Sequence, residues 1–477
     1  MKSVAVIGAG FAGLSAALEL ARRGVRATVI DALPSAGGRA QRLEFEGYRF
    51  DAGPTLLVMT DVLRTTLGND AFERLELRRL SPGYRVFWPD GEHFDMSSNL
   101  AEFLEQTTRF EGTLRNAEAV RYLARVHDLY LRSRANILDV DHTVGSFVRT
   151  LLAPGRFSPW AAGRLRAFVR RSFASPRVVD ALTFQPLYLG TSPRRAPALY
   201  SMLAVEEVVG GIWYCPGGTA AVVDALVSRC EAAGVRFSFG REVEEIRVSG
   251  GRARTLICPD ARIDVDGVVV TADRETAMTT LFARKRPARS PRYGHSAMVW
   301  YVGLRKRLEL PHHSVMLPSD PWREYERLDS ACIPNEPLVY ACNAAVDDAS
   351  IAPPGHSALL LLAPVPNTRA LPAFEETALF DKVISRLERH AGPIRPEIAL
   401  VRARGPREFR SDLRLTHGAA FGPDHTLDQM GAFRPPIRHA RYDNVVFAGS
   451  GTHPGSGVPM VMLSGRMAAT RLAGALA

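Results

Sequence analysis

The residues best suited to chemistry stand at the start of the chain, in a glycine-rich motif that fits a bound pyrophosphate. Gly8-Ala9-Gly10-Phe11-Ala12-Gly13 has the G-x-G-x-x-G spacing of a dinucleotide-binding turn. In such a turn the first glycine makes the bend, the second lets the backbone approach the pyrophosphate, and the third permits close packing of helix on strand. Free N–H groups at the start of the helix face the phosphates. The motif predicts a dinucleotide cofactor.

The segments around this turn have the order that a nucleotide-binding unit requires. Residues 3–7 are an apolar, β-branched run typical of a strand buried on both faces, and an apolar-periodic helix follows the motif and ends near Gly24. A second strand over 26–30 finishes at Asp31, where a carboxylate would bond the ribose hydroxyls of the adenosine. An isolated glycine motif is a weak signal, but this context favours a dinucleotide site over an ordinary turn.

A second glycine-rich motif, Gly449 to Pro459, follows the strand predicted over 444–448 and opens a helix that runs to the end of the chain. Pro459 suits the first turn of that helix. The glycines offer another place where backbone approaches a ligand closely, with helix N–H groups aimed at it. A positive helix end at this place would stabilise negative charge that develops on a bound cofactor.

The nature of the dinucleotide is indicated by Gly37-Gly38-Arg39. A glycine pair followed by arginine, soon after the acidic strand end, resembles an extension found in flavoproteins of the amine oxidase and phytoene desaturase superfamily. The resemblance implies FAD as the cofactor and Arg39 as a bidentate ligand of its phosphates. The alternative for Arg39 is a plain surface arginine.

Motifs from end to end of the chain resemble the bacterial-type phytoene desaturase family of carotenoid enzymes. They are FDAGPT at 50–55, GIWYCPGGT at 211–219, APVP at 363–366, FRSD at 409–412, HGAAF at 417–421 and GSGTHPGSGVP at 449–459. The last is the most specific, because amine oxidases have a different sequence at this turn.

Two departures from the family pattern stand near the expected flavin. Ser450 and Ser456 occupy positions where alanine is expected, and Met460-Val461-Met462 replaces a glycine among small residues. These departures indicate a sub-branch with a different polyene substrate.

The resemblance also implies which residues contact FAD. Val243, in a strand predicted over 242–248, would lie with its backbone against the adenine. The complete implied set is Gly8, Gly10, Phe11, Ala12, Gly13, Asp31, Gly38, Arg39, Gly53, Pro54, Thr55, Val243, Gly449, Gly457 and Val458.

The reaction implied by the family removes hydrogen from adjacent saturated carbons of a long polyene. Such a C–H bond is not acidic, so the expected scheme is hydride transfer to the flavin with proton loss from the neighbouring carbon. It depends on positioning and exclusion of water more than on a strong base. Candidate catalytic residues are Arg410, Asp412 and His417, with His453 nearby, and Asp412 or His417 would accept the proton. Alternatively, Arg410 and Asp412 form a structural ion pair and His453 caps a turn.

Basic residues exceed acidic ones, at 60 Lys+Arg against 50 Asp+Glu, and the net charge of +10 favours an anionic partner. Residues 145–190 hold seven arginines and a single acid, Asp180. An apolar helical stripe in this segment is typical of a helix lying on an anionic membrane, and it consists of Leu165, Phe168, Val169 and Phe173. The alternative is a solvated basic face over a core stripe. Nucleic acid is not favoured as a partner, because no recognised binding motif is present.

The cysteine content and the length of the apolar runs indicate where in the cell the protein is located. The five cysteines are scattered without a C-x-x-C, which argues against disulfides and against a metal site. The first strand begins at Ser3, which argues against a signal peptide, and no apolar run approaches the roughly 18 residues of a spanning helix. We expect a cytoplasmic protein associated peripherally with the inner face of the cell membrane. The electron acceptor, oxygen or a quinone, is left open.

The order of elements predicts an α/β fold with a discontinuous, Rossmann-like FAD-binding domain and an inserted α+β substrate domain that has a helical membrane-facing region. The FAD-binding parts are 1–75, 206–275 and 431–477, and the substrate parts are 76–205 and 276–430. We expect a hairpin over 84–95, mainly helix over 100–185, helices at 220–233 and 374–391, and strands at 235–240, 242–248, 252–258, 268–273, 295–304, 338–342 and 358–363.

The sequence is compatible with three alternative functions. The first is FAD-dependent desaturation of a carotenoid polyene. The second is another reaction on the same flavin, such as isomerisation, terminal oxygenation or 3,4-desaturation of a modified carotene. The third is a flavin-free protein that binds a prenyl lipid, which the complete phosphate site argues against. The sequence favours the first.

Overall fold

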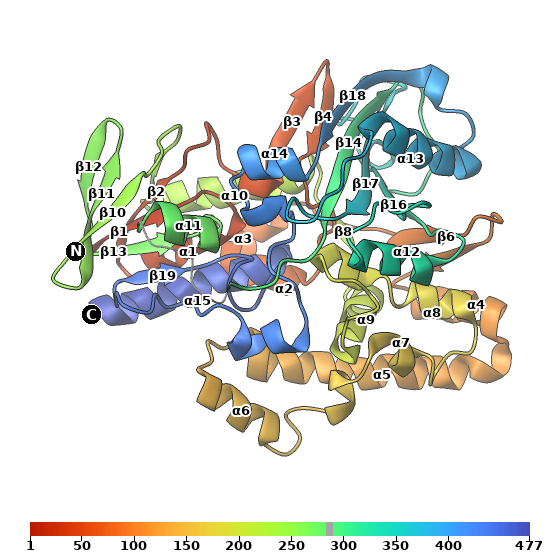
Figure 1. The fold of residues 1–477 in the computed structure, drawn as a ribbon, viewed down its shortest axis with the longest axis horizontal. Helices are drawn as coiled ribbons and strands as arrows, with labels where there is room; N and C mark the ends of the chain where they lie inside the picture. Colours follow the sequence, from red (N-terminus) through yellow and green to blue (C-terminus); the bar gives the residue numbers. More distant parts are fainter. Residues whose placement is uncertain (283–289) are drawn as a thin grey trace.

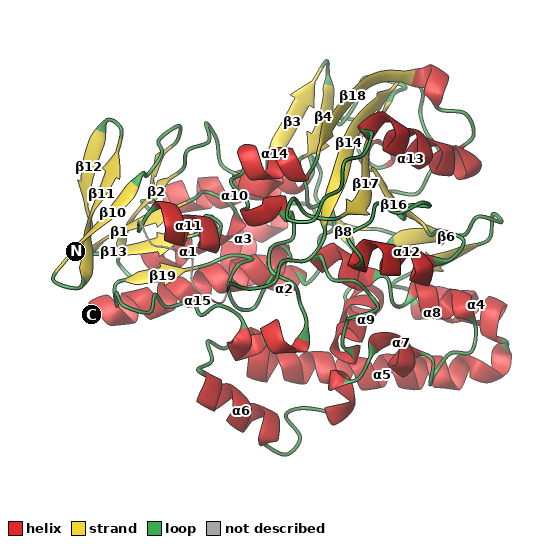
Figure 2. Ribbon diagram, in the orientation of Figure 1, coloured by secondary structure: helices red, strands yellow, loops and turns green. Residues whose placement is uncertain are grey.

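The computed structural model describes residues 1–282 and 290–477, and most of its strands gather in two sheets (Figures 1 and 2). A parallel sheet of five strands has the order β19-β13-β1-β2-β9. Its strands come from three distant parts of the sequence: β1 (Ser3–Ile7), β2 (Arg26–Ile30), β9 (Arg236–Ser238), β13 (Gly267–Val270) and β19 (Val445–Phe447).

Both faces of this parallel sheet are covered. Val4 and Val6 of β1 share an apolar core with α1 (Phe11–Arg22), α10 (Thr219–Ala232) and α15 (Val458–Leu476). Ala5 and Ile7 point the other way, onto an antiparallel sheet of β10 (Glu245–Ser249), β11 (Arg252–Cys258) and β12 (Ala261–Asp264). Because successive side chains of a strand point to opposite faces, burial on both sides explains the unbroken apolar run of β1.

A second sheet has seven strands in the order β18-β14-β17-β16-β15-β6-β7. Neighbouring strands are antiparallel except β15 and β6, which are parallel. The strands are β6 (Tyr84–Phe87), β7 (His93–Met96), β14 (Ser296–Leu304), β15 (His313–Met316), β16 (Val339–Asn343), β17 (Ser357–Val365) and β18 (Ile398–Arg404).

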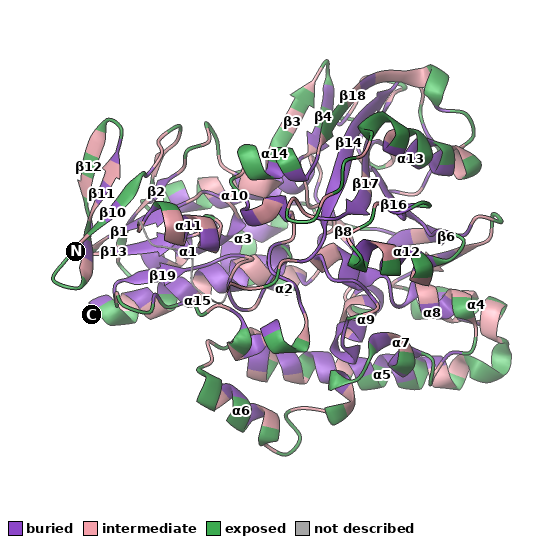
Figure 3. Ribbon diagram, viewed as in Figure 1, coloured by how far each residue is buried: buried purple, intermediate pink, exposed green. Residues whose placement is uncertain are grey.

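Strand β14 is buried along its whole length and separates two apolar cores (Figure 3). Trp300 and Val302 point to the face covered by α13 (Glu376–Ala391). Val299 and Tyr301 point to the opposite face, toward the helical region. The alternation along this strand therefore decides which of its side chains border the interior space described below.

The helical region covers that opposite face and fills the lower part of the view (Figure 2). Within it, α9 packs against the long α5. The helices are α4 (Leu100–Glu111), α5 (Asn116–Ser133), α6 (Val144–Leu152), α7 (Leu165–Val169), α8 (Pro176–Ala181) and α9 (Ser201–Val209), with a π-helical turn, η3 (Arg134–Leu138), after α5. Among the residues that the structure describes, no helix is both long and apolar enough to span a membrane.

Short elements complete the fold. They are α2 (Thr60–Leu67), α3 (Asn69–Glu73), α11 (Arg274–Thr280), α12 (Pro321–Asp329), α14 (Pro406–Ser411), β3 (Arg42–Phe45), β4 (Tyr48–Asp51), β5 (Arg78–Arg79) and β8 (Trp213–Tyr214).

The predicted α/β class is confirmed, and most predicted elements exist with shifts of a few residues at their ends. The strand predicted over 242–248 begins only at Glu245. The predictions missed β12, β15, β18 and α12, whose sequences mix polar and apolar residues without a clear period.

Candidate active site

One cavity of about 690 Å³ runs from the glycine turn before α1 to the space beneath the seven-stranded sheet. The part that we call the nucleotide arm is lined by Gly8, Gly10, Asp31, Gly38 and Arg39. The part that we call the apolar arm is lined by Leu199, Leu203, Val299, Val315 and Leu362. All the predicted cofactor residues line this cavity except Gly13.

Glycine is needed at Gly13 and at Gly10 of the first turn for different physical reasons. A Cβ on Gly13 would lie 1.9 Å from the carbonyl oxygen of Gly8, so close packing excludes any side chain there. A Cβ on Gly10 would meet only the carbonyl oxygen of Gly37, at an ordinary 3.7 Å. Gly10 begins α1 without a side-chain cap, so helix N–H groups are left for a ligand. The open space at Gly10 and these donors fit a pyrophosphate.

Asp31, at the end of β2, holds this turn in addition to lining the cavity. Its carboxylate accepts hydrogen bonds from the N–H of Ala9 at 2.6 Å and from the N–H of Leu33 at 2.8 Å. Burial raises the pKa of Asp31, and the two backbone hydrogen bonds oppose that shift. Asp31 therefore borders the cavity, as a residue that contacts a ribose would have to.

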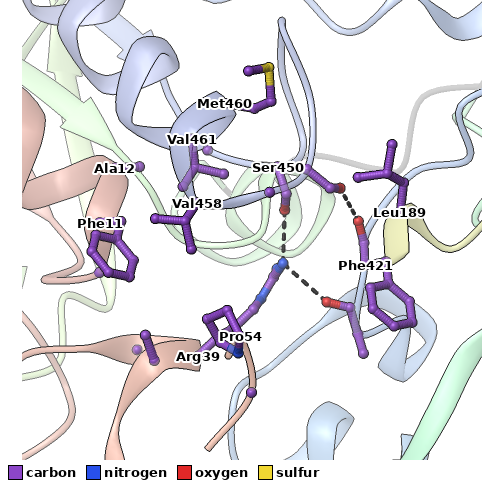
Figure 4. Close-up of a pocket in the computed structure, with 18 of the residues that line it drawn as sticks. Phe11, Ala12, Arg39, Pro54, Leu189, Phe421, Ser450, Val458, Met460 and Val461 are labelled. Carbon is purple, nitrogen blue, oxygen red and sulfur yellow. Dashed lines mark hydrogen bonds between the residues drawn. The ribbon is translucent and has the colours of Figure 1, made fainter. Parts of the chain in front are cut away.

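Arg39 points into the cavity, between Pro54 and Ser450 (Figure 4). Its Nη1 donates hydrogen bonds to Ser450 Oγ at 2.9 Å and to the carbonyl oxygen of Ala420 at 3.2 Å. Burial lowers the pKa of Arg39, with the charge of Asp273 acting in the opposite direction. The alternative of a plain surface arginine is therefore wrong.

The two serines that depart from the family pattern hold the same piece of chain. Ser450 Oγ accepts from Arg39, and Ser456 Oγ donates to the carbonyl oxygen of Phe421. Both contacts tie the segment Ala420-Phe421 to the C-terminal motif, and all these residues line the cavity. Of the second departure, Met460 lines the cavity whereas Met462 is buried in the core behind it.

A buried arginine that the sequence did not reveal stabilises this C-terminal loop. Arg434 is 2% exposed and donates hydrogen bonds to the carbonyl oxygens of Ser450 at 2.8 Å, Thr452 at 3.1 Å and Pro423 at 3.1 Å. Several acceptors around one guanidinium offset the cost of burying its charge. No local motif surrounds Arg434, because its partners are distant in sequence.

The three candidate catalytic residues lie in different places in the structure. Asp412 lines the cavity, and its carboxylate lies 3.8 Å from the guanidinium of Arg404. Arg410 is exposed on α14, outside the lining. His417 is also outside the lining, in a left-handed turn (φ 57°) with its ring edge-on to Tyr293. The structural ion pair formed by Asp412 is thus with Arg404 and not with Arg410.

Two buried histidines line the cavity. The Nε2 of His453 donates to the carbonyl oxygen of Ile137 in η3 at 2.9 Å, and burial lowers the pKa of His453 to about 4. His425, which the sequence did not single out, accepts a hydrogen bond from the N–H of Ser456 at 3.3 Å. Burial and the charge of Arg434 lower the pKa of His425. Both imidazoles are neutral at pH 7.

The stripe predicted to face a membrane is buried. Leu165 and Phe168 of α7 are at most 5% exposed. The ring of Phe168 stacks on Trp160 with 4.2 Å between centroids, and Phe173 meets Tyr122 of α5 edge-on at 5.1 Å. The prediction that this stripe enters a bilayer is wrong, because α5 already covers it. The alternative, a basic face over a core stripe, is the one observed.

A comparison with protein families matches residues 11–473 to the model described as flavin containing amine oxidoreductase. The chain is 32% identical to a zeta-carotene-forming phytoene desaturase of Myxococcus xanthus, over 99% of this chain and 94% of that protein. It is 31% identical to a carotenoid 3,4-desaturase of Haloarcula japonica, over 99% and 98%. It is also 31% identical to a phytoene dehydrogenase of Streptomyces griseus, over 99% and 95%.

Solved structures share the fold at low sequence identity. An oxidoreductase from Methanosarcina mazei superposes with a TM-score of 0.65 at 16% identity, over 97% of this chain and 98% of that one. Putrescine oxidase bound to putrescine superposes with a TM-score of 0.63 at 14% identity, over 98% of each chain. The likeness extends over nearly the whole of both chains, so the arrangement of the two sheets and the helical region is a shared one.

Proposed function

The chain belongs to the flavin-containing amine oxidoreductases and, among them, to the carotenoid desaturases, and we propose that it desaturates a long apolar polyene at the cavity described above. It is an oxidoreductase of CH–CH groups with FAD as its cofactor. The observation that carries the assignment is the continuity of one cavity from a phosphate-binding turn into an apolar arm. A flavin-free lipid carrier would have no use for the nucleotide arm.

When bound, FAD supplies the hydride acceptor that the chain itself lacks. The chain's residues would hold it: the start of α1 at Gly10 faces the pyrophosphate, and Arg39 lies farther along the same arm. Gly457 and Val458 line the cavity at the start of α15, so the positive end of this helix would stabilise negative charge that develops at the adjoining ring edge. We propose that 1–75, 206–275 and 431–477 form the FAD-binding domain and that 76–205 and 276–430 form the substrate domain.

The apolar arm positions the substrate and excludes water. Leucine, valine and methionine side chains from the seven-stranded sheet and from α9 form its walls. A polyene has no polar handle along its length, so shape and apolar contact set its register. For the proton lost from the neighbouring carbon, we propose Asp412 as the acceptor, because of the three candidates it alone lines the cavity. We propose oxygen or a quinone as the final electron acceptor.

We further propose that the enzyme takes its lipid-soluble substrate from an anionic membrane, at the inner face of the cell membrane, through a surface on α6. Val144, Val148 and Leu152 lie four residues apart on this helix and are 54%, 40% and 79% exposed. Exposed Arg149 lies on the same helix and exposed Arg156 follows it. An apolar stripe flanked by arginines is suited to the surface of an anionic bilayer.

The neighbourhood of α6 supports this route. Phe433, 49% exposed, packs edge-on against Phe147 of α6 at 5.8 Å between centroids. Gly431 and Met430 precede Phe433 in the chain and line the cavity. The stripe on α6 therefore adjoins a wall of the cavity, at a place where a substrate leaving the bilayer would need to pass only a thin layer of side chains.

The function is tested by loading the purified protein with FAD and incubating it with anionic liposomes that contain phytoene or a partly desaturated carotene. Chromatography follows the products under air and with an added quinone. The expected result is a gain of conjugated double bonds that requires FAD. Normal FAD binding without any desaturated product, with either acceptor and either substrate, would overturn the proposal.

A further inference from the structure

A buried carboxyl group stands in the apolar arm, where a hydrocarbon substrate needs none. Glu207 of α9 is 6% exposed and lines the cavity. Its Oε2 accepts a hydrogen bond from Tyr84 Oη at 2.8 Å, and Tyr84 Oη accepts one from Gln185 Nε2 at 2.9 Å. Burial of a carboxyl group is costly unless hydrogen bonds compensate it. The desaturation reaction described above assigns Glu207 no role.

Tyr188 presents a second polar group to the same end of the arm. It lines the cavity, and its Oη is shielded from solvent and has no hydrogen-bond partner within the described parts of the chain. The ring packs edge-on against Phe184 at 5.6 Å between centroids, which fixes its direction. Glu207 is close enough for its charge to raise the pKa of Tyr188, next to the larger effect of burial. Because Tyr188 also lines the cavity, a polar atom of a bound ligand would supply the partner that this hydroxyl lacks.

Glu207 lies apart from a predicted cofactor contact on the same wall. Thr55, a predicted cofactor residue, shares a hydrogen bond of 2.5 Å with Tyr340 on β16. Tyr84, the partner of Glu207, begins β6, which is two strands farther along the sheet. Two strand spacings amount to about 10 Å. Glu207 therefore lies about two strands away from the Thr55 contact, whereas Tyr188 is close enough to Tyr340 for that hydroxyl to affect its pKa.

The wall of the cavity is closed behind Glu207. Tyr84 and Gln185, which stand behind Glu207, are fully buried and do not line the cavity. Together they hold the carboxyl group in place, since Gln185 Nε2 also donates to the carbonyl oxygen of Ala181 at 2.8 Å. These contacts fix the Glu207 carboxyl group in the wall of the cavity.

We propose that Glu207 and Tyr188 bind a hydroxyl group at the end of the polyene, so that the preferred substrate is a hydroxylated carotenoid. This inference rests on the proposed function and specifies its substrate class. A hydroxyl group donates to a carboxyl oxygen of Glu207 and accepts from the hydroxyl of Tyr188, which satisfies both groups.

The protonation of Glu207 is compatible with a hydroxyl ligand. Burial raises its pKa to about 8, against the hydrogen bond from Tyr84. At neutral pH the carboxyl group is mostly protonated, so it places little charge in the apolar arm. A hydroxyl group pairs with either form of the carboxyl group, whereas a carbonyl oxygen, which only accepts, pairs with the protonated form alone.

Binding of two linear polyenes of equal length and conjugation tests the proposal, one a hydrocarbon and the other with a single terminal hydroxyl. The FAD-loaded enzyme is titrated with each in detergent micelles, and Kd is read from the shift of the polyene absorption band. We expect the hydroxylated polyene to bind about 10-fold tighter, the effect of one to two buried hydrogen bonds. Tyr188→Phe and Glu207→Leu should each bring the two Kd values close to equality by weakening only the hydroxylated ligand.

Control variants separate recognition from folding. Glu207→Gln keeps a donor and an acceptor and should retain most of the preference. Tyr122→Phe removes a buried hydroxyl that lies outside the cavity lining and should leave both Kd values unchanged. Equal Kd values in the wild type, or a preference that survives in both Tyr188→Phe and Glu207→Leu, would overturn the proposal.

Turnover of the same two polyenes tests the underlying function separately. A binding preference without any new double bond supports the hydroxyl site and contradicts desaturation. Equal binding with efficient desaturation of the hydrocarbon overturns the hydroxyl site and leaves the function standing.

Discussion

Arg39 Nη1 donates a hydrogen bond of 2.9 Å to Ser450 Oγ and so joins two glycine motifs that stand 411 residues apart in the sequence. The same nitrogen reaches the carbonyl oxygen of Ala420, and Ser456 binds the carbonyl oxygen of the next residue, Phe421. Alanine at 450 and 456 would lack both contacts. The serines that depart from the family pattern therefore complete one wall of the cavity.

Replacement of Arg39 by alanine should weaken FAD retention. The variant loses a cation that is directed into the nucleotide arm, and a hydrogen bond to a charged group contributes about 1.5–3 kcal/mol. We expect Kd for FAD to rise on the order of 10- to 100-fold, measured by titration of the apoprotein. Arg42→Ala is the matched control, because Arg42 is exposed and pairs with Asp224 on the surface. Normal flavin content in Arg39→Ala would contradict the assignment.

The second and third glycines of the first turn, Gly10 and Gly13, should respond differently to replacement by alanine. Gly10→Ala should fold normally, because its φ and ψ of −79° and −179° suit any residue and its Cβ meets no close atom. It should nevertheless lose FAD, since the methyl group occupies the space of the pyrophosphate. Gly13→Ala should lower Tm strongly even without FAD, because its Cβ collides with the Gly8 carbonyl oxygen. Thermal unfolding of both apoproteins measures the difference, and equal Tm values would refute it.

Asp412→Asn tests the proposed proton acceptor. Loss of a positioned general base lowers turnover by roughly 10²- to 10⁴-fold. We expect such a loss in kcat with unchanged flavin content. Arg410→Ala, an exposed neighbour outside the cavity, should retain activity. If Asp412→Asn desaturates at the wild-type rate, the proton goes elsewhere.

Glu207 should make the folded state less stable as pH rises. Its pKa is about 8 in the folded protein and 4.5 as its ordinary value. Between these values the folded state keeps a proton that the unfolded chain has released, so stability falls with pH by at most about 1.4 kcal/mol per unit. The loss is complete above the folded pKa. Glu207→Gln cannot ionise, so its Tm advantage over the wild type should grow from about pH 5 to about pH 8 and then level off. A Tm difference that is independent of pH would contradict a protonated Glu207.

The surface on α6 should be needed for membrane binding. Val148→Glu with Leu152→Glu removes two exposed apolar contacts, each expected to contribute about 1.5–3 kcal/mol if buried in lipid, and adds negative charge. Co-sedimentation with anionic liposomes should fall at least about 10-fold. Leu114→Glu, at a residue 96% exposed in the turn after α4, is the control and should bind as the wild type does. Unchanged co-sedimentation of the double variant would exclude this surface.

The glycine turn of the nucleotide arm could be predicted because neighbouring residues in the sequence set its geometry. Strand, turn and helix over 3–22 follow one another without a break. The contacts that require glycine in this turn come from residues only a few positions away in the sequence. The strand and helix around 449–459 follow the same rule. The conformation of such a turn depends mainly on residues that are close in the sequence, so it can be predicted from the sequence.

The prediction that this particular apolar stripe faces lipid failed for a physical reason. The spacing of Leu165, Phe168 and Phe173 shows that one side of a helix is apolar, but lipid and protein present the same chemistry to that side. Only the position of α5, with Tyr122 against Phe173, showed that protein covers it. The stripe on α6 stays exposed because no described element packs over Val148 and Leu152.

The sequence by itself determined the fold class, FAD as the cofactor and the family, since each depends on short motifs in a fixed order. Only the tertiary structure decided which residues share the cavity. Glu207 and Tyr188 carry no motif, and Asp412 and Arg410 are two residues apart yet only Asp412 lines the cavity. Contacts of this kind join segments far apart in the chain, and the packing of sheets and helices, rather than local spacing, sets which side chains meet.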